Sequence, residues 1–404
     1  MDIEHVKNQH AICGNNSGSA GAFGIETARA AAAWHATFPE YEPTPLVQLD
    51  SLARDLGVGG FYVKDESKRF GLNAFKVLGG SYAMGKCIAD ILGMSLDDLP
   101  YGVLMGEEVR RKLRQAAGDL TFVTATDGNH GRGVAWTAAQ LGLNAVVIMP
   151  RNSSLERLDN IRKLGARASF VDANYDEAVR LAAAWAREHG WLVVQDTSWD
   201  GYEEVPRWIM EGYTTLALEA VEQLGDARPT HVFLQAGVGS MAGAVAGFLA
   251  DYYGEDMPVI SIVEPTAADC VFRTAQADDG RLHAVTGDLS SIMAGLSCGE
   301  PCPLGWDVLA QHARHFFSIA DWVSAEGMRI LAHPLAGDAP IESGESGACT
   351  TGLAAELMRN PAYAALRDDL GLGRDSVVLC ISTEGATDRA NYNRIVNEGA
   401  YPRA

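Results

Sequence analysis

The chain has no long run of apolar residues. No stretch approaches the roughly 18 uninterrupted apolar residues of a membrane span, and the first residues, MDIEHVKNQH, lack the apolar core of a secretion signal. Positive charge is also scarce, since 32 Lys and Arg stand against 52 Asp and Glu and give a formal net charge of −20. Such a surface repels phosphate backbones and anionic lipids. We therefore expect a cytoplasmic protein that binds neither nucleic acid nor membranes.

Cysteine is sparse, and its spacing does not fit a metal site. The seven cysteines are scattered along 404 residues without a CxxC pair. Cys298 and Cys302 lie four positions apart, but no nearby histidine completes a zinc ligand set, so we expect no metal. Most of the thiols are expected to be reduced. A disulfide that involves Cys270 or Cys298 stays open.

Short β-rich runs alternate with helix-like stretches. The clearest runs are FYVKDE, LTFVTAT, NAVVIMP, WLVVQDT, THVFLQAG, PVISIVEP and SVVLCIST. This alternation predicts βαβ units and mostly parallel sheets, so the predicted fold class is α/β. The length predicts two domains. We assign residues 1–79 and 196–404 to a larger domain and residues 80–195 to a smaller one, with a cleft between them.

Four of the predicted strands end in polar or glycine-rich turns. These turns are TATDGNHG, VVQDTSWDGY, LQAGVGSMAG and CISTEGATD, and ligands of open α/β sheets bind beyond the carboxyl ends of strands. The third turn opens an Ala/Gly-rich helix, where backbone N–H groups can converge on an anion. We predict that this turn binds a phosphate group through Gly237, Val238, Gly239, Ser240 and Met241.

Lys76 lies in the apolar stretch LNAFKVLGGSYA, between a predicted strand and a predicted helix. An amine in apolar surroundings titrates more easily, which favours imine formation. Pyridoxal phosphate needs such a lysine to form a Schiff base. It also needs backbone N–H groups that bind its phosphate, a donor to its ring hydroxyl and a partner for its pyridine nitrogen. Asn129 can serve the ring oxygen, and Thr383 can serve the pyridine nitrogen.

The phosphate turn also fits the dinucleotide pattern G-x-G-x-x-A. Gly237, Gly239 and Ala242 occupy its positions, and Glu264 ends the next strand. An NAD-dependent oxidoreductase is therefore an alternative. It leaves Lys76 and the other three turns without a role, so a single phosphate is favoured.

Several motifs together resemble the fold type II pyridoxal-phosphate enzymes. The segments NAFKVLGGSYA, TATDGNHGRGVAW, QAGVGSMAG and STEGATD carry the resemblance over nearly the whole chain, and VVQDTSWDGYEEVPRWIMEGY, IMAGLSCGEPCPLGW and ESGESGA are most similar to the diaminopropionate ammonia-lyases. The resemblance implies two open, twisted, mostly parallel sheets flanked by helices, with the active site in the cleft between the domains. It also implies pyridoxal 5'-phosphate as cofactor, a homodimer, and elimination of ammonia from both isomers of 2,3-diaminopropionate to give pyruvate.

Two aspartates favour a substrate with two amino groups. Asp127 stands where related dehydratases and synthases carry a small residue, and Asp196 ends the strand WLVVQDT. Carboxylates attract and orient a β-ammonium group. We predict Lys76, Asp127 and Asp196 as the catalytic acid/base groups. The resemblance implies that lysine and aspartate lie on opposite faces of Cα, since both isomers are substrates of the related lyases.

A serine or threonine dehydratase of the same fold remains the alternative function, since a hydroxyl leaving group usually takes its proton from the cofactor phosphate. We expect His130 to pack the loop that contains it. The segment 342–348, ESGESGA, receives no role.

Overall fold

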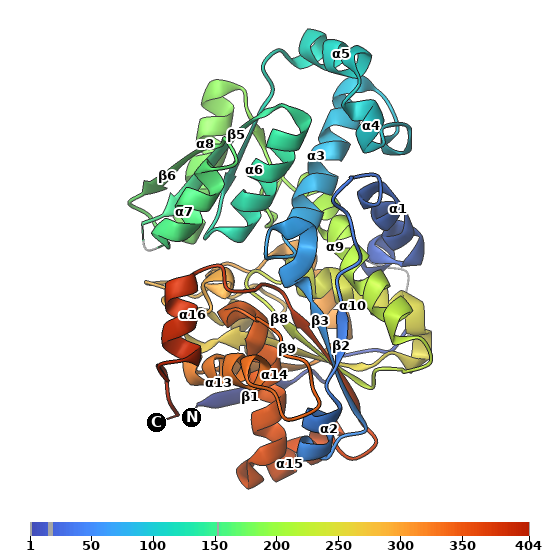
Figure 1. Ribbon diagram of the computed structural model, residues 1–404, viewed down its shortest axis with the longest axis vertical. Helices are drawn as coiled ribbons and strands as arrows, with labels where there is room; N and C mark the ends of the chain where they lie inside the picture. The colour runs from blue at the N-terminus through green and yellow to red at the C-terminus, as the bar shows by residue number, and fades with distance from the viewer. Residues whose placement is uncertain (1, 15–18, 152, 404) are drawn as a thin grey trace.

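The computed structural model describes residues 2–14, 19–151 and 153–403. Within these ranges the strands form two sheets, one with the order β1-β10-β9-β8-β11-β3-β2 and one with the order β6-β5-β4-β7 (Figure 1). The seven-stranded sheet contains β1 (Ile3–Lys7), β2 (Leu46–Gln48), β3 (Gly60–Asp65), β8 (His231–Gln235), β9 (Val259–Pro265), β10 (Ala313–Ile319) and β11 (Val377–Ser382). The four-stranded sheet contains β4 (Thr121–Ala125), β5 (Asn144–Pro150), β6 (Arg167–Val171) and β7 (Leu192–Val193).

Both sheets are mostly parallel. In the described residues the antiparallel pairs are β1 with β10 and β2 with β3, at the two edges of the larger sheet. Strands β4 and β8 are buried along their whole length. Parallel strands covered on both faces need apolar residues at every position, which explains the continuous apolar runs in the sequence. The predicted α/β class, with two mostly parallel sheets flanked by helices, is confirmed.

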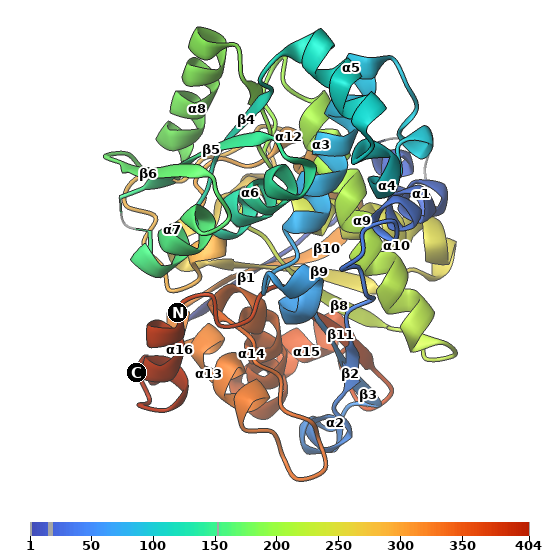
Figure 2. The same ribbon diagram turned by 45° about the horizontal axis from the view of Figure 1, so that its top comes forward.

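Helices surround both sheets. Those near the four-stranded sheet are α4 (Tyr101–Leu104), α5 (Glu107–Ala117), α6 (Asn129–Leu141), α7 (Leu155–Arg162) and α8 (Tyr175–His189), and Figure 2 shows α6 and α7 against it. The others are α1 (Ile25–His35), α2 (Asp50–Leu56), α3 (Val77–Leu92), α9 (Glu204–Leu224), α10 (Ser240–Tyr253), α11 (Cys270–Ala277), α12 (Pro303–His312), α13 (Asp321–Ala332), α14 (Glu345–Arg359), α15 (Ala364–Leu370) and α16 (Arg389–Val396). Over the described ranges, no helix is both long enough and apolar enough to span a membrane.

The four-stranded sheet lies inside the range 80–195, and every strand of the larger sheet lies outside it. The division into a smaller domain of residues 80–195 and a larger one of residues 1–79 and 196–404 stays a prediction, and its first boundary falls within helix α3.

Helix α3 runs between the two parts of the molecule and packs closely on α9 and α6 (Figure 1). A Cβ on Gly79 would lie 2.8 Å from the carbonyl oxygen of Ile209, and a Cβ on Gly133 would lie 2.8 Å from the Cα of Val77. A side chain cannot be accommodated at such distances, so the contact of α3 with α9 and the contact of α3 with α6 both require glycine. Because Lys76 directly precedes α3, this packing fixes the backbone from which its side chain extends.

Four buried charged residues hold β3 and the turn after it. The Lys64 Nζ lies 2.7 Å from Glu219 Oε2, and the Arg69 guanidinium contacts Glu219 Oε1 at 2.7 Å and Glu66 Oε1 at 2.8 Å. Two cations thus face two anions in the interior, which is the condition under which buried charges are tolerated. The cluster anchors the segment that leads to Lys76 against helix α9.

Candidate active site

A pocket lies at the carboxyl ends of β8 and β11, where α3 and α10 begin. It contains all of the predicted site residues except Asp127, namely Lys76, Asn129, Asp196, Gly237, Val238, Gly239, Ser240, Met241 and Thr383. Asp127 lines an adjoining cavity of about 390 Å³. The polar turns identified in the sequence therefore converge at one place, because the carboxyl ends of parallel strands share one edge of the sheet.

Lys76 points into this pocket and forms an ion pair with Asp196. Burial alone would lower the pKa of Lys76, but the negative charges of Asp196 and Asp127 raise it above its ordinary value. Its ammonium is thus held in one position by a buried carboxylate. This raised pKa is opposite to the easier titration that the apolar surroundings predicted, because a carboxylate faces the amine.

Asp196 is ionised and is held by several donors. The Tyr175 hydroxyl donates to its Oδ1 at 3.0 Å, and Gln195 Nε2 donates to the same oxygen at 3.1 Å. Burial favours the neutral acid, but His130 and Lys76 outweigh it and lower the pKa of Asp196 below its ordinary value. The carboxylate is therefore a fixed negative charge beside the lysine.

Asp127 lies in a different electrostatic environment. Burial raises the pKa of Asp127, although Arg157 and Lys76 act in the opposite direction. The Arg157 Nη1 lies 3.5 Å from Asp127 Oδ2, and its Nη2 donates to Thr387 Oγ1 at 3.0 Å. Two neighbouring carboxyl groups whose pKa values are moved apart are a common arrangement for acid/base chemistry.

Gly295 lies between Asp127 and the lysine pocket. It lines the pocket, and a Cβ at this position would lie 3.7 Å from Asp127 Oδ2 and 2.9 Å from Ser346 Oγ. A larger residue would fill the space between the Asp127 carboxylate and the pocket. Glycine therefore leaves Asp127 access to a molecule bound beside Lys76.

The segment 237–241 has the conformation of an anion cradle. Gly239 has φ 97°, a left-handed conformation that favours glycine, and immediately precedes α10. In the described residues no side chain caps this helix, so its first N–H groups remain available for a phosphate. A Cβ on Gly237 would lie 3.3 Å from the carbonyl oxygen of Gly295, so a side chain there would crowd the cradle.

Gln235 contacts the hydroxyl of Thr383. Gln235 Nε2 lies 2.9 Å from Thr383 Oγ1, and it also contacts the carbonyl oxygens of Ser346 at 3.0 Å and Ile381 at 2.8 Å, so its two hydrogens are shared among three acceptors. The hydroxyl hydrogen of Thr383 has no acceptor among the described residues and can donate into the pocket. Gln235 Oε1 is buried and has no hydrogen-bond partner among the described residues. The sequence analysis missed Gln235, although it is the last residue of the strand before the phosphate turn.

Glu384 and Ser346 were also missed. Asn129 Nδ2 donates to Glu384 Oε2, and the backbone N–H of Ser346 donates to Glu384 Oε1 at 3.1 Å. An amide nitrogen carries two hydrogens, so Asn129 retains one for a ligand in the pocket. Glu384 directly follows Thr383 in the motif STEGATD, and Ser346 belongs to the ESGESGA segment that received no role. Adjacency to a predicted site residue was the available signal for Glu384.

His130 has a packing contact and lies close to Asp196. Its Nε2 contacts the Val194 carbonyl oxygen at 2.8 Å, which accounts for the expected packing role. Its Nδ1 lies 3.9 Å from Asp196 Oδ2. Burial lowers the pKa of His130, and the charge of Asp196 opposes this shift.

Glu264 does not face the glycine turn as a ribose ligand would. It is fully buried, and its carboxylate accepts hydrogen bonds from the backbone N–H groups of Val271 at 3.0 Å and Phe272 at 2.6 Å. Its oxygens are used to fix the start of α11. The geometry therefore disfavours the dinucleotide alternative.

All seven cysteines carry free thiols, including Cys270 and Cys298. Neither forms the disulfide that the sequence left open.

The residues fit pyridoxal phosphate. A partly buried lysine amine, an uncapped helix start behind a glycine turn, and a buried Thr383 hydroxyl with a free hydrogen surround one pocket, and together they match the aldehyde, the phosphate and the pyridine nitrogen of this cofactor. The family model described as pyridoxal-phosphate dependent enzyme matches residues 37–384. Fold, site and family model define a pyridoxal-phosphate dependent enzyme, and pyridoxal 5'-phosphate is its cofactor.

Individual relatives narrow the assignment. The chain is 51% identical over 371 residues to the diaminopropionate ammonia-lyase of Salmonella typhimurium, covering 91% of each chain, and 49% identical over 382 residues to that of Escherichia coli strain K12, covering 94% of this chain and 93% of the relative. A crystal structure of the Escherichia coli enzyme in complex with an aminoacrylate-PLP azomethine reaction intermediate matches with a TM-score of 0.91 and 46% identity over 100% of this chain and 98% of that one. The chain belongs to the diaminopropionate ammonia-lyase family.

More distant matches share the fold. A threonine deaminase structure from Solanum lycopersicum matches with a TM-score of 0.71 at 18% identity, over 98% of this chain and 97% of that one.

Proposed function

We propose that this enzyme uses pyridoxal phosphate to eliminate ammonia from both isomers of 2,3-diaminopropionate, giving pyruvate and ammonia. One observation carries the proposal: the Lys76 amine pairs with Asp196, and a second carboxyl group, that of Asp127, lies beyond Gly295 in the adjoining cavity. Relatives named diaminopropionate ammonia-lyase, about half identical over nearly the whole chain, support it.

Bound pyridoxal phosphate supplies an electron sink that stabilises negative charge at Cα of an amino acid. Lys76 would hold its aldehyde carbon, and the N–H groups of residues 237–241 would hold its phosphate. Thr383 would serve its pyridine nitrogen, and Asn129 would serve its ring oxygen through the amide hydrogen that Glu384 does not use.

Lys76 and Asp127 are the groups proposed to remove the Cα proton. An amine and a carboxylate on opposite faces of one carbon allow either enantiomer to be deprotonated. We assign the L isomer to Lys76 and the D isomer to Asp127. The access that Gly295 leaves between Asp127 and the pocket supports the second assignment.

Asp196 is proposed to select a substrate with a second amino group. Its carboxylate is ionised and buried, so it attracts the β-ammonium group strongly in the absence of competing water. The hydrogen bond from Tyr175 fixes the direction in which this charge points. A hydroxyl in place of the β-ammonium would gain much less from this charge, which disfavours serine and threonine.

A comparison of substrates tests the proposal. Pyruvate release is measured with D- and L-diaminopropionate and with D- and L-serine, and 2-oxobutyrate release is measured with L-threonine. We expect kcat/KM for both diaminopropionate isomers to exceed that for serine and threonine by at least about 100-fold, since an amino acid without the β-ammonium leaves Asp196 unpaired. Equal or greater rates with the hydroxy amino acids would assign the enzyme to the dehydratases.

We further propose that the enzyme works in the cytoplasm as a homodimer. Seven free thiols support a reducing compartment, and the dimer follows from the family resemblance. Light scattering of the purified holoenzyme measures the mass, and a monomeric mass would contradict the dimer.

A further inference from the structure

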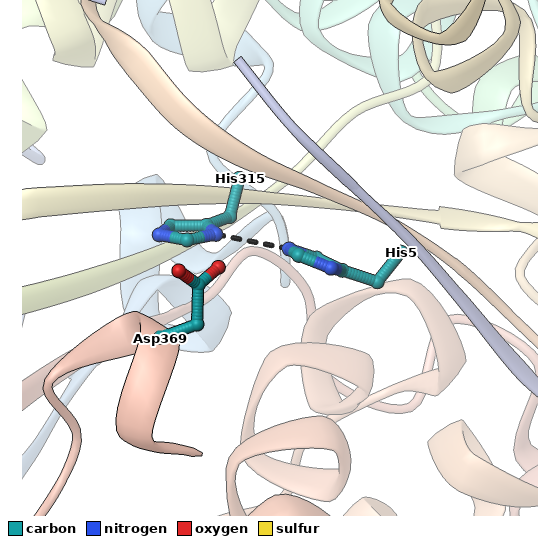
Figure 3. Close-up of side chains that lie close together, drawn as sticks. All are labelled: His5, His315 and Asp369. Atoms are coloured by element: carbon teal, nitrogen blue, oxygen red, sulfur yellow. Dashed lines mark hydrogen bonds between the residues drawn. The ribbon is translucent and has the colours of Figure 1, made fainter. Parts of the chain in front are cut away.

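We propose that His5, His315 and Asp369 form a binding site for one divalent transition-metal ion, of the kind that zinc occupies. Each residue offers one ligand atom, and these atoms lie within 4.8 Å of one another. None of the three lines the lysine pocket, and the mechanism proposed above does not use them. Figure 3 shows the two imidazoles facing each other, with the carboxylate of Asp369 beside them.

The fold brings the three residues together from distant parts of the chain. His5 lies on the edge strand β1 and His315 on its antiparallel neighbour β10, while Asp369 lies on α15. The two histidines are diagonal neighbours, since His5 pairs with Phe317 in register and His315 with Lys7. Their side chains project to the same face, so a bound ion would join the first strand, the sheet and a C-terminal helix.

The distance between the imidazoles is close to that in a metal site. His5 Nε2 lies 2.9 Å from His315 Nδ1. Two ligands of a tetrahedral zinc ion, each about 2.0–2.1 Å from the metal, lie about 3.3 Å apart. The nitrogens need to separate by only about 0.4 Å to admit an ion. His5 is half-buried and Asp369 is exposed, so both can adjust while His315 stays fixed.

His315 makes no hydrogen bond outside the proposed metal site among the described residues. Its side chain is fully buried, and its Nε2 makes no hydrogen bond within the described residues. Buried ring nitrogens without a partner are uncommon. The contact with His5 is thus the only hydrogen bond of this ring among those residues, and a metal ion replaces it without breaking another.

The ligand types select the class of metal. Two imidazoles and one carboxylate suit zinc, cobalt or nickel, whereas magnesium and calcium prefer oxygen ligands throughout. Three protein ligands leave a fourth position for water, on the exposed side where Asp369 lies.

Lys7 competes with the metal. Its amine forms an ion pair with Asp369, and the side chains of both residues are about one third exposed. A metal ion must displace this ammonium from the carboxylate or share the carboxylate with it. Removal of the Lys7 charge should therefore strengthen metal binding, an outcome that distinguishes a three-ligand site from a pair of packed histidines.

The test uses holoenzyme that has been treated with chelator and then saturated with pyridoxal phosphate. Zinc binding is measured by equilibrium dialysis with elemental analysis, and Co²⁺ is added separately to record the visible ligand-field bands of a tetrahedral site. We expect one zinc ion per chain in addition to any ion bound elsewhere. We also expect the melting temperature to rise with zinc concentration.

Variants assign this ion to the three residues. His5→Gln and His315→Gln should each weaken zinc binding by more than about 100-fold, beyond the 10- to 100-fold typical of a residue that only supports a ligand. Lys7→Gln should tighten binding by about 10-fold or more, because a competing charge is lost. The matched control is His283→Gln, since His283 also pairs with an aspartate, at 3.0 Å, and is likewise partly exposed, but its pair lacks a second imidazole.

Each result has one meaning. Loss of the ion in His5→Gln together with its retention in His283→Gln supports the site. Equal zinc binding by the wild-type enzyme and His5→Gln overturns it, as does Lys7→Gln without tighter binding. His5 is half-buried, so His5→Gln keeps the test valid if substitution of the buried His315 prevents folding, and ammonia-lyase activity of each variant reports on its folding.

Discussion

The Tyr175 hydroxyl donates a hydrogen bond of 3.0 Å to Oδ1 of Asp196, the carboxylate whose other oxygen forms the ion pair with Lys76. Tyr175 is the first residue of α8, which packs on the four-stranded sheet. A helix on the four-stranded sheet therefore helps to position the Asp196 carboxylate that pairs with Lys76.

Substitution of Tyr175 by Phe should reduce kcat/KM about 10-fold for both isomers of diaminopropionate. A hydrogen bond to a charged group contributes about 1.5–3 kcal/mol, and Asp196 retains Gln195 and Lys76 as partners. Because the Tyr175 hydrogen bond helps to lower the pKa of Asp196, its loss raises that pKa, and the acid limb of the pH–rate profile moves to higher pH.

Tyr202→Phe is the matched control for Tyr175→Phe. The Tyr202 hydroxyl is hydrogen-bonded to the backbone N–H of Gln195 at 2.9 Å and to the Val193 carbonyl oxygen at 3.0 Å, but not to Asp196. The Tyr202→Phe variant should therefore leave the acid limb of the pH–rate profile unchanged. Identical shifts in both variants would mean that the effect is structural and does not arise at Asp196.

Asp127→Asn should separate the two enantiomers. An amide cannot accept the Cα proton, so kcat with D-diaminopropionate should fall by about 10²–10⁴, the usual contribution of a general base. The L isomer, assigned to Lys76, should lose less than about 10-fold. Single-turnover rates of pyruvate formation with each isomer measure this ratio inside one variant, which removes differences in folding. An equal loss with both isomers would contradict the assignment of the two faces.

Arg157→Gln should shift the pH dependence of the D isomer alone. The Arg157 charge lowers the pKa of Asp127 against the effect of burial, so its removal raises that pKa. Asp127 must be deprotonated to act as a base, and the acid limb of kcat/KM for the D isomer should therefore move to higher pH. Arg151→Gln is the control, because Arg151 lines the same cavity but pairs with the exposed Asp172. A shift in both variants would point to a general loss of positive charge.

The parts of the site that the sequence predicted are those set by local structure. A strand, a glycine turn and a helix start follow one another at residues 231–253, so the anion cradle could be placed from neighbouring residues. Lys76 at the start of α3 was found in the same way. Motif similarity supplied Asp127 and Asp196, which spacing alone would have left as turn residues.

The unpredicted parts depend on contacts between distant residues. Asn129 and Glu384 are 255 positions apart, and Gln235 and Thr383 are 148 positions apart. The first pair meets only after both sheets have formed, and the second only after β8 has paired with β11. A glutamate or glutamine at the end of a strand also has many other uses. The pattern of buried and polar positions therefore predicts which edge of the sheet carries the site, while the polar pairs within it require the tertiary structure.

The buried charges behind Lys76 give a prediction about stability. Glu219 accepts from both Lys64 and Arg69, and Glu219→Gln leaves these two buried cations with Glu66 as their remaining anion. The loss of one member of such a cluster costs roughly 3–5 kcal/mol of the free energy of unfolding, measured by urea denaturation with saturating cofactor. Glu222→Gln, an exposed position on the same helix, should change it by less than about 0.5 kcal/mol.

The pH dependence of this difference identifies its origin. The cations lower the pKa of Glu219 to about 2 against the effect of burial, whereas an unfolded glutamate titrates near 4.3. A lowered pKa stabilises the folded state above the unfolded value, and this stabilisation is lost as the pH falls toward the folded value. The difference between wild type and Glu219→Gln should be constant near neutral pH and shrink as the pH is lowered below about 5. A difference that does not change over this range would show that the lost packing of the side chain, and not its charge, is responsible.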